Sequence, residues 1–181
     1  MEISRRYKIY IAIIIAVAIT LTLRWGYYHN RWRTIEMPKD GYRISYPAYW
    51  FNSTHKAIRG PVGKWTSLEV TNFPFVNSIM VRVYVDEFVH PSDNDVTDWA
   101  LEIIKKDGCE TWSLPQQIQL PQAPSSGMMT ECIDDVGYHC KIVAFAYDDR
   151  IYAVELLTFK KQWQKGNSIF ERILSSFEIF E

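Results

Sequence analysis

The stretch YHCKIVAFAYDDRIYAVELLTF, residues 138–159, predicts two β-strands, Tyr138–Tyr147 and Arg150–Phe159, joined by the Asp148–Asp149 turn. Acidic residues in a two-residue connection are typical of a tight β-hairpin. Both strands carry apolar side chains at consecutive positions, which indicates that both faces of the hairpin are covered. We therefore expect a central antiparallel sheet with helices on each face, or with helices on one face and a partner on the other.

Segments on either side of the hairpin extend the predicted sheet. Ile79–Asp86, IMVRVYVD, alternates valine with other residues, as a strand with two distinct faces does. Ser126–Ile133 is expected to pair with the first strand of the hairpin. Shorter strands are predicted at Gly41–Trp50 and Lys64–Thr71, and the proline-interrupted residues 114–127 are expected to be extended.

Two amphipathic helices complete the predicted domain. The first spans Asp95–Lys106, with Asp95 as its N-cap and Gly108 just past its end. Its apolar residues recur every three or four positions, so one side of it packs on the sheet. The second helix is expected near Ser168–Phe177. The predicted fold class is α+β, an antiparallel sheet of about five to seven strands flanked by two or three helices.

A transmembrane helix is expected ahead of this domain. Ile9–Leu23, IYIAIIIAVAITLTL, holds no charged residue. A helix of this length spans roughly 22 Å of a hydrocarbon core of roughly 30 Å. Extending it to Tyr7–Tyr28 brings it to membrane length, because basic ends can snorkel and aromatic rings can lie at the interface. The expected membrane-interface residues are Lys8, Arg24, Trp25, Tyr27 and Tyr28.

Three interpretations of this segment stay open: an uncleaved anchor, a cleaved signal peptide and a buried helix of a soluble protein. Bulky, basic residues without a small-x-small cleavage motif follow it, which favours the anchor. We expect an anchor at residues 1–28, a juxtamembrane linker at 29–39 and a folded domain at 40–181. Basic residues flank both ends of the anchor. Since an N-terminal anchor usually exports the domain that follows, we expect a cytoplasmic N-terminus and an extracytoplasmic domain.

The distribution of charge excludes one class of partner. Residues 1–33 contain six basic side chains and one acidic side chain, whereas the remaining 148 residues contain 14 basic and 20 acidic ones. Nucleic-acid binding requires clustered lysine and arginine to contact phosphates. The acidic domain is therefore not expected to bind nucleic acid.

The three cysteines show no zinc-site spacing. If residues 135–137 form a hairpin loop, Cys132 and Cys140 lie opposite each other on neighbouring strands. Opposite strand positions are within disulfide range. A Cys132–Cys140 disulfide is therefore a candidate, and a bridge that involves Cys109 and three buried thiols are the alternatives.

Candidate ligands for a divalent cation lie in the most acidic stretch, residues 86–95. They are His90, Asp93 and Asp95, whose nitrogen and oxygen atoms suit such an ion. The alternative is a solvated loop whose acidic residues cap the next helix. The sequence has no serine-histidine-aspartate order, P-loop or GxGxxG motif, so neither catalytic residues nor a cofactor are expected.

Two segments together resemble the PsbP-like superfamily. The first is DGYRISYPAYW, Asp40–Trp50, with a Gly-aromatic-x-Ile-x-Tyr-Pro-x-x-Trp pattern. The second lies in Asp148–Phe180, where DDRIYAVELLTFKKQW precedes IFERILSSFEIF. This superfamily includes the extrinsic PsbP proteins of photosystem II, bacterial relatives and a Ran-binding nuclear transport factor. The resemblance covers residues 40–180 and implies an α/β/α sandwich with an accessory or docking role and no catalytic residues.

The leading functional hypothesis is a non-catalytic, single-pass membrane protein. Its PsbP-like domain would dock, as an accessory or assembly subunit, on a larger integral membrane protein complex of photosynthetic or respiratory type. That complex and the lipid bilayer are the expected partners. The alternative is a membrane-tethered module that binds a small ligand or a divalent cation. A large exposed apolar patch favours the first hypothesis, and a concave pocket with convergent polar groups favours the second.

Overall fold

The structure is a computed structural model that describes residues 5–55, 59–60, 63–72, 79–87, 91–106, 108–109, 112–120, 126–133 and 137–180 of the 181-residue chain. The chain forms two compact units. The first contains Met1–Arg33 and Pro47–Tyr49, and the second contains Thr34–Tyr46 and Trp50–Glu181.

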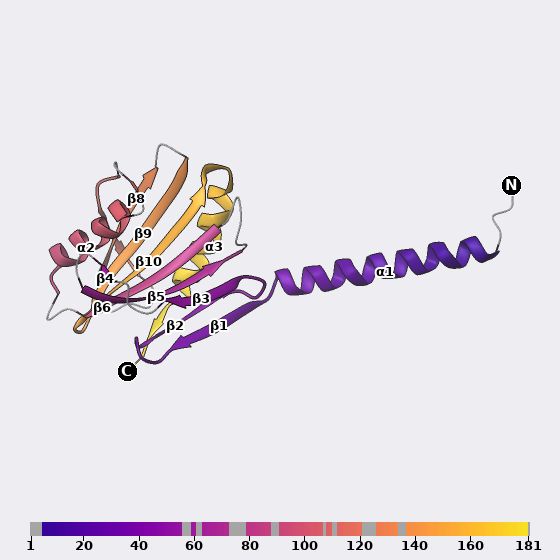
Figure 1. The fold of residues 1–181 in the computed structure, drawn as a ribbon, viewed down its shortest axis with the longest axis horizontal. Coiled ribbons are helices and arrows are strands. Elements are labelled where there is room, and N and C mark those ends of the chain that lie inside the picture. Colours follow the sequence, from indigo (N-terminus) through magenta and orange to yellow (C-terminus); the bar gives the residue numbers. More distant parts are fainter. Residues whose placement is uncertain are drawn as a thin grey trace. The chain divides into compact units, whose positions relative to one another are not determined.

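Helix α1, drawn in indigo in Figure 1, spans Arg5–His29 in the first unit. Thr20 and Thr22 donate hydrogen bonds of 2.8 Å to the carbonyl oxygens of Ala16 and Ala18, so their hydroxyl groups are satisfied within the helix. Among the residues that the structure describes, no helix is long and apolar enough to cross a membrane, and the expected transmembrane helix is not confirmed.

A large antiparallel sheet dominates the second unit, with the strand order β3-β5-β6-β10-β9-β8-β7, and with β4 paired to β5 (Figure 1). A small sheet has the order β1-β2-β11. The strands of the large sheet are β3 (Phe51–His55), β4 (Arg59–Gly60), β5 (Gly63–Thr71), β6 (Ile79–Glu87), β7 (Gln116–Gln119), β8 (Ser126–Ile133), β9 (Tyr138–Tyr147) and β10 (Arg150–Phe159). The remaining elements are β1 (Trp32–Met37), β2 (Tyr42–Pro47), α2 (Asp93–Lys106), the 3₁₀ turn η1 (Lys160–Gln162), α3 (Trp163–Ser175) and β11 (Glu178–Ile179).

The predicted hairpin is confirmed. Strands β9 and β10 pair in antiparallel register from Tyr147 opposite Arg150, so Asp148 and Asp149 form the two-residue turn. Asp148 has a φ of 52°, in the left-handed region that such turns require and that aspartate tolerates. Strand β6 pairs along the other side of β10. The α+β class with a large antiparallel sheet is therefore as the sequence predicted.

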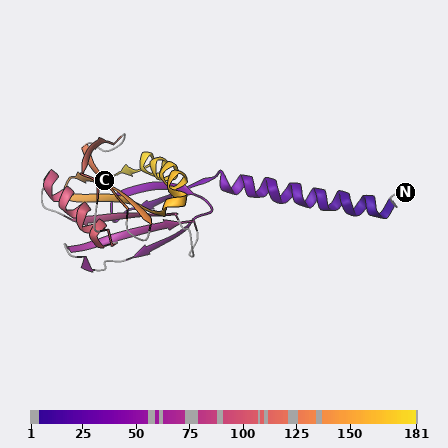
Figure 2. The same ribbon diagram turned by 90° about the horizontal axis from the view of Figure 1, so that it is seen from above.

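The two long helices of this unit cover opposite faces of the large sheet. On the α2 face, Trp99 and Ile104 of α2 pack in one buried cluster with Ile142 and Ala153 of the sheet. On the α3 face, Gly166 lies against Thr158, whose position in β10 points to the other side. Figure 2 shows both helices against the sheet from a second direction.

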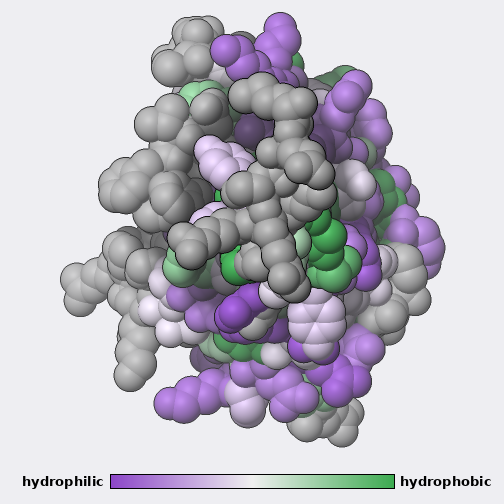
Figure 3. Space-filling model, turned by 90° about the vertical axis from the view of Figure 1, so that its right-hand side faces the viewer, coloured by the Kyte–Doolittle hydropathy of each residue, from purple (hydrophilic) through white to green (hydrophobic). Residues whose placement is uncertain are grey.

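Figure 3 shows the side of the molecule that is on the right in Figure 1. Hydrophilic residues predominate among the coloured residues of this side.

A cluster of four aromatic rings lies on the α3 face. Tyr42 stacks on Phe177 with ring centroids 5.2 Å apart, and Phe145 stacks on Tyr152 at 5.6 Å. Phe177 also meets Phe145 edge-on at 5.4 Å. These rings join the small sheet and the C-terminal segment to the large sheet, because stacked and edge-to-face aromatic pairs bury large areas in specific geometries.

The structure differs from the sequence-based expectations at three places in the chain. Residues 29–39, predicted as a linker, contain β1, and the Oγ1 atom of Thr34 lies 2.9 Å from Oγ of Ser45 on β2. Strand β3 was not predicted, because it lies at the edge of the sheet and its side chains at residues 51–54 are exposed. Three of these four side chains are polar, so the strand has no apolar pattern. Helix α3 begins at Trp163 rather than near Ser168, directly after η1.

Candidate functional site

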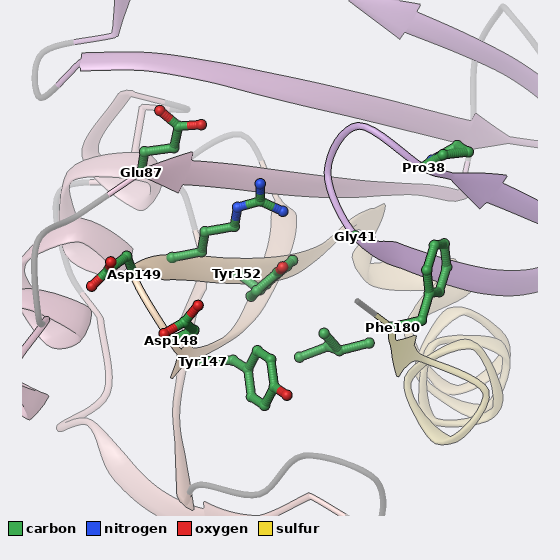
Figure 4. A pocket seen from close by; sticks show the side chains of 10 residues that line it. Pro38, Gly41, Glu87, Tyr147, Asp148, Asp149, Tyr152 and Phe180 are labelled. Carbon is green, nitrogen blue, oxygen red and sulfur yellow. The ribbon is translucent and has the colours of Figure 1, made fainter.

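A pocket of about 740 Å³ opens where the β9–β10 turn, the end of β6 and the small sheet come together. Its residues come from four parts of the sequence, so folding rather than local sequence creates it. It is lined by Pro38, Gly41, Glu87, Tyr147, Asp148, Asp149, Arg150, Tyr152, Ile179 and Phe180 (Figure 4).

Strand register and one glycine position the central side chain of this pocket. Arg150 lies opposite Tyr147 on β9 and opposite Glu87 on β6. Gly41 has a φ of 70°, and a Cβ atom there would lie 3.0 Å from Nη1 of Arg150 and 3.1 Å from the carbonyl oxygen of Phe180. Glycine therefore serves two purposes here, a left-handed backbone and a close approach to the guanidinium group.

A hydrogen bond holds the charge of Arg150, and burial keeps its neighbour Tyr152 neutral. The hydroxyl of Tyr152 donates to the carbonyl oxygen of Asp40 at 3.0 Å. The hydrogen bond between the Arg150 and Tyr152 side chains raises the pKa of Arg150. Burial raises the pKa of the Tyr152 hydroxyl. Both groups therefore keep their protons at neutral pH, and the pocket contains a fixed cation.

Three carboxylates line the same pocket as this cation. The side chains of Glu87, Asp148 and Asp149 are set around the pocket (Figure 4). All three residues are exposed. A concave surface lined by polar groups of both signs is suited to holding a charged group by ion pairs and hydrogen bonds.

The structure describes two of the three predicted cation ligands, Asp93 and Asp95. His90 lies outside the described residues, so the set of His90, Asp93 and Asp95 stays a prediction. Oδ2 of Asp95 accepts hydrogen bonds from the amide and hydroxyl of Ser92 at 2.8 and 2.6 Å. Among the described residues, no three histidine, cysteine, aspartate or glutamate side chains are placed to hold a metal ion.

These contacts form a capping box at the start of α2. The amide of Asp95 donates back to Oγ of Ser92 at 3.3 Å, so each residue satisfies a backbone group of the other. The N-cap is therefore Ser92, and Asp95, predicted as the N-cap, is the third helical residue. The same hydrogen bonds lower the pKa of Asp95.

The cysteines do not form the candidate Cys132–Cys140 bridge but one of the stated alternatives, a bridge that involves Cys109. The register places Cys132 opposite Cys140, as predicted. The disulfide nevertheless joins Cys132 to Cys109, with Cα atoms 6.3 Å apart, and Cys140 keeps its thiol. The end of α2 explains this pairing. Gly108 turns the chain with a φ of 87°, and the Cys109 amide donates to the carbonyl oxygen of Ile104 at 3.3 Å.

The expected membrane-interface residues lie on α1. Arg24 and Tyr27 are exposed, and Cζ of Arg31 lies 3.8 Å from the centre of the Tyr27 ring, a cation–π contact. The interfacial role of all five residues stays a prediction. The side chains of three of them lie outside those described: Lys8, Trp25 and Tyr28.

Two features of the domain were not predicted from the sequence. The pocket was missed because its walls join residues 38–41 to the β9–β10 turn and the C-terminal strand. The second feature is Glu155, which is fully buried in β10. It had a sequence signal, since it is the one charged residue between Ile151 and Phe159. A charge inside an apolar strand indicates a buried polar partner.

These observations define a class of protein: a small α/β domain with a large antiparallel sheet, a helix on each face and an acid-rimmed pocket at one end. No family model and no curated protein matches the sequence. The fold is similar to the solution structure of cyanobacterial PsbP (CyanoP) from Synechocystis sp. PCC 6803, with a TM-score of 0.57 and 18% identity over 82% of this chain and 92% of that chain. The fold is therefore PsbP-like, as the sequence resemblance implied.

A second similar structure comes from Bacteroides thetaiotaomicron VPI-5482. That crystal structure has a TM-score of 0.53 and 12% identity, over 82% of this chain and 48% of that chain. The matched region makes up about half of that longer chain.

Proposed function

We propose that this chain is a non-catalytic accessory subunit, held at a membrane by α1, whose PsbP-like domain docks on a larger membrane protein complex. In this arrangement the N-terminus is cytoplasmic and the domain is extracytoplasmic. Similarity to cyanobacterial PsbP supports an accessory role, and photosynthetic complexes are the first partners to test.

The observation that carries this proposal is the apolar surface of α1. Its large apolar side chains between Ile11 and Leu23 are 44–70% exposed. A helix that is apolar all round is normally covered by lipid or by other helices. The uncharged stretch alone is shorter than a bilayer core, so the proposal requires the basic and aromatic ends of α1 to extend it to the interface.

Mild solubilisation of native membranes tests the docking. The chain is expected to migrate with a large complex and to stay with it after a high-salt wash, because the helix contributes contacts that salt does not screen. Migration alone, at the mass of one chain with its detergent, would contradict docking.

A pair of substitutions tests the anchor. Ile15→Arg places a charge at the middle of the uncharged stretch, which costs about 2.5–3.5 kcal/mol of insertion free energy. Leu23→Arg places the same charge beside Arg24, where it can snorkel. We expect Ile15→Arg to move the protein into the carbonate-soluble fraction and Leu23→Arg to leave it in the membrane pellet. Equal partitioning of the two variants would argue against the anchor.

The pocket beside Arg150 favours a second candidate function, a tethered module that binds a small charged ligand. Three carboxylates rim it, so small diamines are the probes, and Ca²⁺ and Mg²⁺ are controls because no three described side chains are placed to hold a metal ion. A ligand that binds only the folded state raises the unfolding temperature. We expect that rise in the full chain, and its loss in Asp149→Asn but not in the α2 control Glu102→Gln. No rise with any probe would remove this candidate.

A further inference from the structure

Three cysteines meet beneath α2. Cys109, Cys132 and Cys140 are at most 5% exposed and belong to the same buried cluster. Cys132 is bonded to Cys109 and also lies directly across the β8–β9 ladder from Cys140. Residues directly opposite in an antiparallel pair have Cβ atoms about 4.5–5.5 Å apart and point to the same face. Cys132 is therefore placed between two cysteines with which it can form a disulfide.

A buried carboxylate contacts the remaining thiol. Sγ of Cys140 donates to Oε1 of Glu155 at 3.4 Å. The other carboxylate oxygen accepts a hydrogen bond of 2.8 Å from the hydroxyl of Tyr84 and lies 3.6 Å from Nη1 of Arg82. A hydroxyl donor and a guanidinium group both favour the ionised carboxylate. An ionised carboxylate has the lone pair that takes up the thiol proton, and the Cys140–Glu155 hydrogen bond is the path for that proton.

We propose that Cys109, Cys132 and Cys140 form an internal thiol–disulfide exchange site in which Glu155 accepts the proton of Cys140. The Cys140 thiolate attacks Sγ of Cys132, so a Cys132–Cys140 bond forms while the Cys109–Cys132 bond breaks. Cys109 leaves as a thiolate and takes up the proton that Glu155 accepted from Cys140. One disulfide and one thiol are present before and after, so the step needs no oxidant or reductant.

The exchange connects two structural states. In the tethered state, the disulfide joins the segment after α2 to β8, as the structure shows. In the stapled state, the disulfide joins β8 to β9, and the end of α2 has no covalent link to the sheet. The position of the disulfide then determines whether α2 can separate from the α2 face at its C-terminal end.

The two states are distinguished by which cysteine carries the thiol. Oxidised full chain in detergent is held at neutral pH, quenched in acid to stop exchange, and alkylated with N-ethylmaleimide in denaturant. Mapping of unreduced peptides is expected to find molecules alkylated at Cys140 and others alkylated at Cys109. Alkylation confined to Cys140, whatever the time of incubation, would overturn the proposal.

The variant Cys109→Ser tests whether Cys140 can reach Cys132. We expect the purified, oxidised variant to contain a Cys132–Cys140 disulfide and no thiol that reacts in denaturant. Two reactive thiols in that variant would show that the stapled state does not form, and this result does not depend on the rate of exchange.

Glu155→Gln tests the proton acceptor. When native protein is held with N-ethylmaleimide, the rate of alkylation at Cys109 reports exchange, and we expect the variant to be at least about ten-fold slower, because a positioned base contributes about 10²–10⁴-fold. The control Glu102→Gln carries the same change on α2, where the carboxylate contacts Lys105 instead. A wild-type rate in Glu155→Gln would remove Glu155 from the step.

Discussion

Among the described residues, the two faces of the large sheet bury charged side chains with different partners: Glu155 and Asp86 lie on the α2 face, and Lys141 lies on the α3 face. On the α2 face, Glu155 is fully buried and contacts Tyr84 and Cys140, which are also buried. On the α3 face, the Lys141 side chain is 8% exposed and its Nζ lies 2.6 Å from Oε1 of Glu171. The Glu171 side chain is 51% exposed.

The free energy lost when a buried charge is removed depends on whether its partners are buried or exposed to water. Removing Glu155 takes an acceptor from donors that water cannot reach, and such donors cost free energy when they lose a partner. Removing Lys141 leaves a glutamate on the surface of α3, where water replaces the lost ion pair. The α2 face should therefore depend on its charge, and the α3 face on its aromatic rings.

Phe177→Ala is expected to give the largest effect. Phe177 is 4% exposed and contacts the rings of Tyr42, Phe145 and Tyr152 within 6 Å. Loss of a buried phenylalanine side chain typically costs about 3–5 kcal/mol of unfolding free energy. Denaturant unfolding of the full chain in detergent measures it. Phe51→Ala is the control, because Phe51 is 59% exposed, and a loss as small as in that control would contradict the aromatic account of the α3 face.

Glu155→Leu is expected to cost about 2 kcal/mol in the same measurement, since a buried donor that loses its acceptor typically costs about 1–3 kcal/mol. The substitution removes the acceptor that the Tyr84 hydroxyl uses, while Arg82 keeps its ion pair with Glu69 at 3.3 Å. Glu69→Gln is the matched control at a partly exposed position. If Glu155→Leu were neutral or stabilising, the α2 face would not depend on its charge.

The same comparison explains which parts of the fold were predictable. The boundaries of β8, β9 and β10 agree with the prediction, because their apolar runs end at turns that aspartate and glycine mark. Strand β1 is short and none of its residues is fully buried, so its partner is selected by tertiary pairing. The partner of Cys132 depends on where Gly108 directs the end of α2, which no local pattern encodes.

The candidate site was predictable only in fragments. The Asp148–Asp149 turn was recognised as acidic, but the sequence does not show that Gly41 and Phe180 meet Arg150 there. Glu155 was visible as a charge in an apolar strand, whereas its contact with Cys140 depends on the register of β9 against β10.

Ser92→Ala tests how much the N-terminal cap of α2 contributes to stability. Helix α2 begins with the Ser92–Asp95 capping box, whereas α3 has no side-chain cap at Gln162. Loss of an N-cap serine costs about 1 kcal/mol of unfolding free energy. Gln162→Ala is the control and should change stability little, and equal effects of the two variants would show that the capping box does not distinguish α2.

The capping box also predicts a pH dependence. The pKa of Asp95 is lowered by its hydrogen bonds to Ser92, so the ionised carboxylate contributes stability above the unfolded pKa of about 4, and this contribution is lost as pH falls through the folded value. We expect the difference in stability between wild type and Asp95→Asn to shrink below about pH 4. A difference that stays constant down to pH 2 would contradict this linkage.

Lys141→Met is expected to give the smallest effect, less than about 1 kcal/mol. Methionine fills the volume of the lysine stem against Phe170, whose ring centre lies 5.7 Å from Nζ. The lost ion pairs are with Glu171 and Glu131, whose side chains are 51% and 43% exposed, so water solvates both carboxylates. A loss of unfolding free energy as large as that of Glu155→Leu would mean that water does not replace the ion pairs of the exposed glutamates. The stability of both faces would then depend equally on their buried charges.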